Sequence, residues 1–222
     1  MNKLRTVLFA LLIILLPLTV LTLSGNIVLR TSAVYGYHFN DSQVIDKIDS
    51  SLSSTEIGNE IAGYFNSFND EEFQIYEQNG EFQDPMFDQS EILVMRRVKT
   101  LLWWMLLGGV FSLVLLIVVY VYLRLWENKH SLRVCGMTAG AASFIAMIVK
   151  GVLILNRGFR ASLYNRFIGV PLSNESTLKI LLGSPLERIY IVFATIIGIA
   201  LTVLFVYVSF ELTKERGMFK EN

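Results

Sequence analysis

The chain of 222 residues contains one cysteine, Cys135, and two histidines. A single cysteine can form no intrachain disulfide. One cysteine and two histidines also argue against a transition-metal site. The sequence also lacks a P-loop and the patterns G-x-G-x-x-G, H-E-x-x-H, C-x-x-C and G-x-S-x-G. We therefore expect no metal, no cofactor and none of the nucleotide-binding, zinc-peptidase, redox or serine-hydrolase sites that these patterns indicate.

Net charge is absent as well, so the overall charge indicates no partner and we expect no binding to nucleic acid. Hydrophobic residues, by contrast, make up 53% of the chain and the mean hydropathy is +0.51, values typical of a polytopic membrane protein. At about 1.5 Å per residue, four apolar stretches are long enough to cross a bilayer. They are residues 6–29, 101–123 (the membrane part of a longer helix over 90–126), 134–155 and 189–210.

The first stretch, residues 6–29, is uncharged and follows Lys3 and Arg5. A cleaved signal peptide is the alternative interpretation, but the run is longer than a usual signal sequence and no A-x-A site follows it. We predict a retained membrane helix. Pro17 should kink this helix, because proline lacks the N–H donor and clashes with the preceding turn.

Residues 30–89 form a strongly acidic segment, in which Arg30 and Lys47 are the only basic residues. The capping box that begins at Ser53 predicts a short amphipathic helix, and the pair at residues 79–80, Asn-Gly, predicts a two-stranded hairpin. A second capping box, Asp88-x-x-Glu91, begins the long helix 90–126. We interpret this segment as a small α+β cap.

A second polar segment, residues 156–188, lies between the last two apolar stretches. In it, Ser173 or Asn174 is predicted to cap a short helix that continues to Leu182 and that Gly-Ser-Pro at 183–185 ends. Basic residues near the apolar stretches gather on one side of the expected topology: Lys3, Arg5, Arg124, Lys129, Arg133, Lys214, Arg216 and Lys220. By the positive-inside rule this side is the cytoplasm. The prediction is an all-α membrane protein with four transmembrane helices, both termini and the tail 211–222 cytoplasmic, and an extracytoplasmic cap.

A second group of basic residues falls on the opposite side, against the usual loop bias. We call it the outer basic belt, and it comprises Arg96, Arg97, Lys99, Lys150, Arg157, Arg160 and Arg166. One interpretation is a site for anionic lipid headgroups. The other is internal pairing with the acidic cap. Lys150 is an intramembrane charge, although it lies near enough to the boundary for its amine to reach water.

The two histidines, His38 and His130, are predicted to lie on opposite sides of the membrane, so they cannot act together. We interpret each as an exposed or interfacial structural residue, and only His38 is placed where an outer site could use it.

The order of these features resembles the bacterial lipoprotein intramolecular transacylase (Lit) family over nearly the full length. The family pattern Ser-Glu-x-x-His-Met-x-Asp-Val is matched at Ser90, Glu91, Met95 and Val98, with Val94 at the histidine and Arg97 at the aspartate. A second pattern, Phe-His followed by aromatics and Asn, is matched at Phe159, Tyr164 and Asn165, with Arg160 at the histidine. A closing Leu-x-x-Pro stretch is kept at residues 182–185.

The resemblance implies a four-helix protein of the bacterial cytoplasmic membrane that moves an acyl chain from a lipoprotein's diacylglyceryl group onto its N-terminal amine. That reaction needs a group that accepts and returns a proton, which valine and arginine cannot do. The candidate catalytic residues are then Glu91, as the base, and Arg160, which can only stabilise negative charge, although a glutamate at the position of Glu91 is more often simply part of a capping box.

Two hypotheses follow. The first is an enzyme-like role on lipoproteins or phospholipids at the outer leaflet. The second is an inactive relative that binds a lipid or another membrane protein. The candidate headgroup-binding residues are Arg96, Arg97, Lys99, Lys150, Tyr164 and Asn165.

Overall fold

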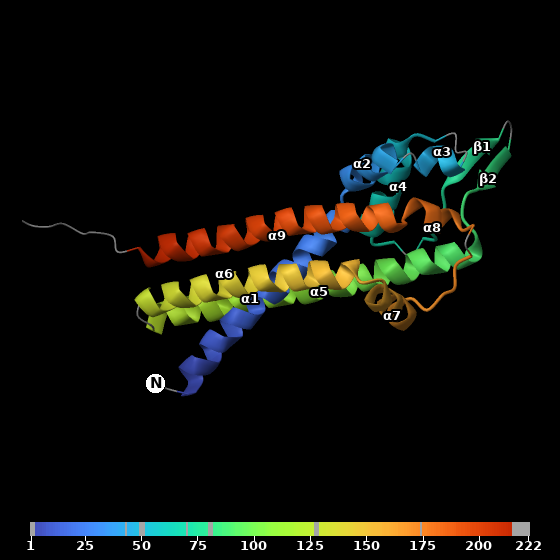
Figure 1. Cartoon of the computed structure of the whole chain (residues 1–222). Coiled ribbons are helices and arrows are strands. Elements are labelled where there is room, and N and C mark those ends of the chain that lie inside the picture. Colours follow the sequence, from blue (N-terminus) through green and yellow to red (C-terminus); the bar gives the residue numbers. More distant parts are fainter. Residues whose placement is uncertain are drawn as a thin grey trace, which may run out of the picture. The chain divides into compact units, whose positions relative to one another are not determined.

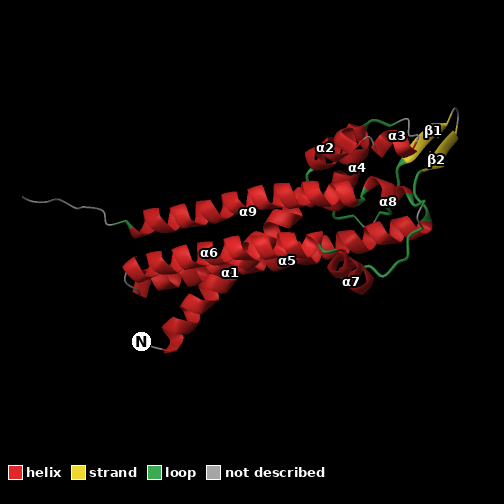
Figure 2. Cartoon of the chain, viewed as in Figure 1, coloured by secondary structure: helices red, strands yellow, loops and turns green. Residues whose placement is uncertain are grey.

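The structure, a computed structural model, describes residues 3–42, 44–48, 52–69, 71–79, 82–126, 129–173 and 175–214. It is built almost entirely of helices, with one pair of short strands (Figures 1 and 2). In chain order the elements are α1 (Lys3–Leu29), α2 (Ser32–Ser42), α3 (Val44–Ile48), α4 (Ser54–Asn66), β1 (Tyr76–Asn79), β2 (Phe82–Pro85), α5 (Gln89–Trp126), α6 (Lys129–Leu155), α7 (Arg157–Phe167), α8 (Thr177–Leu181) and α9 (Ser184–Thr213).

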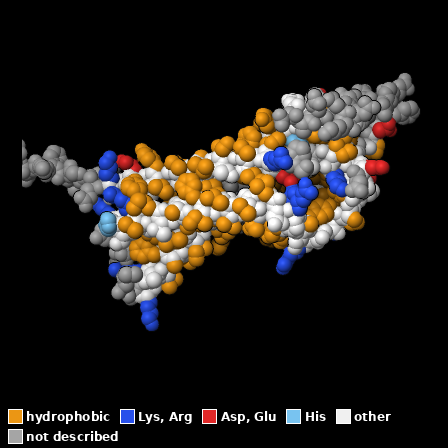
Figure 3. All heavy atoms as spheres, viewed as in Figure 1, with side chains coloured by type: hydrophobic (Ala, Val, Ile, Leu, Met, Phe, Trp, Pro, Cys, Tyr) orange, Lys and Arg blue, Asp and Glu red, His pale blue; other side chains and the backbone are white. Residues whose placement is uncertain are grey.

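Four helices in the described part of the chain are long and apolar enough to cross a membrane, as predicted. They are α1, α5, α6 and α9, with candidate spans Lys3–Leu29, Gln89–Leu125, Lys129–Leu155 and Leu186–Thr213. Hydrophobic side chains cover the visible face of α6 and α9 (Figure 3). α1 continues through Pro17 to Leu29, and the kink stays a prediction.

The chain divides into two compact units. The first unit holds residues 1–23, 107–150 and 195–222, whose described residues belong almost entirely to the four long helices. Its core combines aliphatic residues of α1 and α5, such as Leu12, Leu16 and Leu123, with Cys135 and Ala139 of α6. Cys135 is buried there as a small packing residue.

Small residues of α6 allow α9 to approach closely within the first unit. A Cβ added at Gly136 would lie 2.7 Å from Ser209 Oγ, and one at Gly140 would lie 2.8 Å from Val206 Cγ2. The hydroxyl of Tyr120 donates to Ser209 Oγ at 3.1 Å, which satisfies polar groups inside this packing.

The second unit holds residues 24–106 and 151–194. The capping box at Ser53 is present, and α4 packs side by side with α2. β1 and β2 pair antiparallel in the register Asn79↔Phe82, so the predicted hairpin is confirmed, although Gly80 lies outside the described residues. The sequence did not indicate α2 and α3, which make the cap segment mainly helical.

The second polar segment differs from its prediction in three respects. Asn156 caps an additional helix, α7, by accepting a hydrogen bond from the N–H of Phe159. The cap of α8 is Ser176, not Ser173, and Asn174 lies outside the described residues. α8 ends at Leu181 and only Gly183 of Gly-Ser-Pro lies between the helices, because α9 begins at Ser184. Pro185 falls in the first turn of α9, where its missing N–H removes no helical hydrogen bond.

The packing of α2 against α4 depends on Gly58. A Cβ there would lie 3.2 Å from the backbone nitrogen of Gly36 and 3.3 Å from the carbonyl oxygen of Ser32, and a helix backbone cannot move aside easily. We expect Gly58→Ala to lower the midpoint of thermal unfolding of the full-length protein, because overpacking costs about 1–3 kcal/mol.

Gly63→Ala is the matched control in the same helix, since a Cβ at Gly63 would have no neighbour within 4 Å. Alanine there should raise the stability by up to about 1 kcal/mol through helix propensity. Circular dichroism on heating compares the two variants. A Gly58→Ala protein as stable as Gly63→Ala would contradict this packing.

Candidate functional site

Glu91, in the first turn of α5, is buried and fully engaged. Its Oε1 accepts from the hydroxyl of Ser176 at 2.5 Å and from the N–H of Leu178 at 2.9 Å. Its Oε2 accepts from the N–H of Asp88 at 2.9 Å, which completes the capping box. The carboxylate therefore binds the start of α8 to the start of α5, and its lone pairs are directed at these donors.

Asp88 provides the other half of the same box. Its Oδ1 accepts from the N–H of Glu91 at 2.8 Å and from the hydroxyl of Ser90 at 2.7 Å. Both donors favour the ionised form, so they lower the pKa of the Asp88 carboxyl. A negative charge at this position also interacts favourably with the N-terminal end of the α5 dipole.

Val94 and Arg160 occupy the positions where the family resemblance expects histidines. Val94 is 4% exposed and packs in the interior of the second unit. Arg160, on α7, forms an ion pair with Glu187 in the first turn of α9. A guanidinium paired in this way stays protonated and cannot act as a base.

Arg97 and Tyr164 both satisfy backbone carbonyl groups just beyond the end of α7. The guanidinium of Arg97 donates to the carbonyl of Ile168, the C-cap residue of α7. The hydroxyl of Tyr164 donates to the carbonyl of Val170 at 2.6 Å, and burial raises the pKa of this phenol. Gly169 adopts φ +61° between them, a conformation that favours glycine. Arg97 thus fastens the end of α7 to α5.

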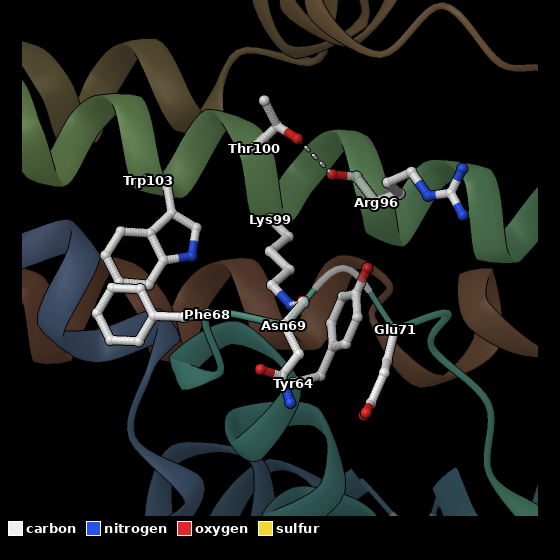
Figure 4. Close-up of a pocket in the computed structure, with 8 residues that line it drawn as sticks. All are labelled: Tyr64, Phe68, Asn69, Glu71, Arg96, Lys99, Thr100 and Trp103. Carbon is white, nitrogen blue, oxygen red and sulfur yellow. Dashed lines mark hydrogen bonds between the residues drawn. The ribbon is translucent and has the colours of Figure 1, made fainter.

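Lys99 reaches from α5 to the loop that follows α4 (Figure 4). Its Nζ donates to Ser67 Oγ at 2.8 Å and to the carbonyl of Asn69 at 2.7 Å, and it lies 4.3 Å from the ring centre of Tyr64. A cavity of about 100 Å³ lies beside it, lined also by Phe68 and Trp103. Lys99 is 8% exposed, so its charge is mainly used within the protein.

Arg96 is the belt residue that pairs with the acidic segment. Its Nη2 lies 2.8 Å from Glu72 Oε1, and both side chains are more than half exposed, at 51% and 58%. Exposed pairs of this kind contribute little to stability, so Arg96 can exchange Glu72 for another acceptor at small cost.

Arg96 and Arg97 also line a crevice of about 490 Å³ along α5. We call it the α5 crevice, and it is lined by Leu93, Arg96, Arg97, Thr100, Leu101, Trp104 and Phe167. Its α5 residues fall in two rows spaced by four, at 93, 97 and 101 and at 96, 100 and 104, which place them on one face of the helix. Sequence reasoning named only the two arginines, although this spacing could have found the apolar residues.

Along α5, the two arginines of the crevice lie between Leu93 on one side and Thr100, Leu101 and Trp104 on the other. Arg97 and Trp104 are seven positions apart, which corresponds to about 10 Å along the helix axis. Trp104 and Phe167 are exposed by 69% and 52%, so both present apolar surface that the described protein does not cover. A ligand that fits must therefore combine a hydrogen-bond acceptor with a hydrocarbon part.

The remaining predicted residues lie elsewhere. Lys150 belongs to the first unit, where its Nζ donates to the carbonyl of Leu21 at 3.2 Å. Asn165 is exposed on α7. His38 is fully buried, with its Nε2 2.8 Å from the carbonyl of Leu181, so of the predicted exposed or interfacial position the exposed one is wrong for His38. His130 is exposed as predicted.

Comparisons with known proteins agree on one family. A family model described as lipoprotein intramolecular transacylase Lit matches residues 10–167. Two similar solved structures are variants of membrane-integral Lit from Bacillus cereus. One carries a histidine-to-arginine mutation, with a TM-score of 0.74, 11% identity and coverage of 95% of this chain and 92% of that one. The other carries a histidine-to-alanine mutation, with a TM-score of 0.75, 11% identity and coverage of 98% and 97%. A search of curated proteins gave no match.

The hydrogen bonds of Glu91 predict a structural contribution. Glu91→Gln replaces one acceptor oxygen by an NH₂ group that must face a donor, so we expect it to lower the stability by about 1–3 kcal/mol. Glu56→Gln is the matched control, because Glu56 holds the same position in an exposed capping box and should change the unfolding midpoint little. Equal midpoints for the two variants in thermal unfolding would contradict the role given to Glu91.

Proposed function

Because the chain belongs to the lipoprotein intramolecular transacylase family, we propose that it binds the diacylglyceryl group of a lipid-anchored substrate in the α5 crevice, without transferring an acyl chain. The observation that carries this proposal is the crevice itself, in which two guanidinium groups adjoin three apolar side chains of α5, the helix that bears the family motif, and Phe167 of α7. The protein is then a membrane-integral binding relative of the transacylases.

The chemistry of a diacylglyceryl group matches both the cationic and the apolar residues of the crevice. Its ester and headgroup oxygens accept hydrogen bonds, which Arg96 and Arg97 can donate at fixed charge. Its acyl chains are hydrocarbon, and Leu101, Trp104 and Phe167 provide an apolar surface for them. From Arg96 and Arg97 to Trp104, the lining changes from cationic to apolar, in the order of the groups in a lipid that enters a leaflet.

The surroundings of the motif support binding rather than acyl transfer. Transfer of an acyl chain to an amine requires a group that takes a proton from nitrogen and supplies one to the leaving glyceryl oxygen. Val94 has no titratable group, and Arg160 is ion-paired with Glu187. Glu91 accepts three hydrogen bonds in the interior, so we assign it a structural role rather than the role of a base.

Binding is expected to depend on Arg96 and Trp104. With the full-length protein in nanodiscs, we expect Arg96→Ala to weaken binding of a fluorescent diacylglyceryl lipopeptide about tenfold, the loss of one charge-assisted hydrogen bond. Trp104→Ala should weaken binding as well, by removing apolar contact. The matched controls on the same helix are Arg124→Ala and Phe111→Ala, since both side chains are exposed and lie outside the crevice.

Competition distinguishes the two sources of the diacylglyceryl group. Unlabelled lipopeptide that displaces the probe better than phosphatidylglycerol indicates a lipoprotein ligand, and the reverse order indicates a phospholipid. Unchanged affinity in Arg96→Ala and Trp104→Ala would overturn the proposed site.

Acyl transfer is tested separately in a bacterial host that lacks a transacylase. We expect mass spectrometry of a lipoprotein N-terminus to give no lyso-form when this chain is expressed, because Val94 has no titratable group, Arg160 pairs with Glu187 and Glu91 accepts three hydrogen bonds. Appearance of the lyso-form would establish the enzymatic alternative and exclude the inactive one.

A further inference from the structure

We infer that α7 is an interfacial helix that lies in the headgroup region and binds an anionic leaflet through its arginines. The inference does not depend on the proposed substrate, and it concerns a surface that the crevice only borders. It rests on where α7 is attached, on its charge and on the arrangement of its apolar side chains.

Two attachments place α7 at the ends of membrane spans within the second unit, and a third holds it to α5. The α6 span ends at Leu155 and α7 begins at Arg157, so at most about 7 Å of chain separates them. Arg160 pairs with Glu187, which follows the first residue of the α9 span, Leu186. Arg97 of α5 holds the other end of α7 through Ile168. A helix fixed to the ends of two spans must lie at the level where those spans leave the hydrocarbon.

α7 is too short to enter the bilayer as a span, and its composition suits a position along the surface. It has 11 residues, or about 16 Å of helix, against the roughly 30 Å of a hydrocarbon core. It contains Arg157, Arg160 and Arg166 and no acidic residue. Among the described residues, no acidic side chain pairs with Arg157 or Arg166.

The apolar residues of α7 form one stripe. Phe159, Leu163 and Phe167 are spaced by four, and Arg160 and Arg166 flank this stripe on the helical wheel. The second unit covers the stripe poorly, because no residue of α7 is buried and Leu163 is 39% exposed. A basic helix with an uncovered apolar stripe, attached at span ends, fits a leaflet of anionic lipid better than a water-facing position.

Depth measurements on the full-length protein test this position. In a Cys135→Ser background, we would attach a spin label at Leu163→Cys on the stripe or at Asn165→Cys, its control on the opposite face. In phosphatidylglycerol nanodiscs, we expect the first label to collide mainly with oxygen and the second mainly with a water-soluble nickel complex. Equal nickel accessibility at the two positions would overturn the inference, even if substrate binding is normal.

The electrostatic part is tested by lipid preference in native mass spectrometry. We expect Arg166→Gln to reduce the preference for phosphatidylglycerol over phosphatidylcholine about fivefold, the effect of one basic residue near a membrane surface. Arg166→Lys keeps the charge and should keep the preference. An unchanged preference in Arg166→Gln, with the depth pattern intact, would contradict the claim that the arginines of α7 bind anionic lipid.

Discussion

The charged groups in the first turns of α5 need partners before this helix becomes apolar, and the second unit is arranged around that need. An unpaired charge in a region of low dielectric constant costs several kcal/mol, so each group must find a hydrogen bond or a counter-ion. Glu91 accepts a hydrogen bond from the start of α8. Lys99 donates to the loop after α4, and Arg97 donates to the end of α7. Hydrogen bonds of the charged side chains of α5 therefore attach the segments around it.

Much of the fold was accessible from the sequence because it depends on local signals. The four apolar spans, the two capping boxes and the hairpin follow from runs and spacings within a few residues of each other. The missed elements, α2, α3 and α7, have weaker signals. α7, with no buried residue, acquires its place from contacts such as Arg160 with Glu187, which join positions far apart in the chain.

The candidate site was accessible only in part for the same reason. The sequence identified Arg96 and Arg97 as unusual outward charges, and their use was left open between lipid binding and internal pairing. The structure gives a mixed answer, since Arg96 pairs with the acidic segment at Glu72 whereas Arg97 and Lys99 donate to carbonyl oxygens. Which basic side chains can still bind a ligand depends on how exposed each one is in the folded chain.

Binding and catalysis separate cleanly in this account. Lipid binding, as proposed, needs only the α5 crevice, and acyl transfer additionally needs side chains that carry protons beside it. A binding relative can keep the first property while Val94 and Arg160 stand where the second would be provided. On this proposal, the apolar and cationic residues of the crevice are the part of the protein that still binds lipid.

Photoaffinity labelling tests the crevice most directly. A diacylglyceryl lipopeptide with a diazirine in one acyl chain would be crosslinked to the full-length protein in nanodiscs, and the adducts mapped by peptide mass spectrometry. The account predicts adducts on the peptides that contain Leu101, Trp104 and Phe167, suppressed by excess unlabelled lipopeptide. Adducts confined to other helices, or not reduced by the competitor, would contradict it.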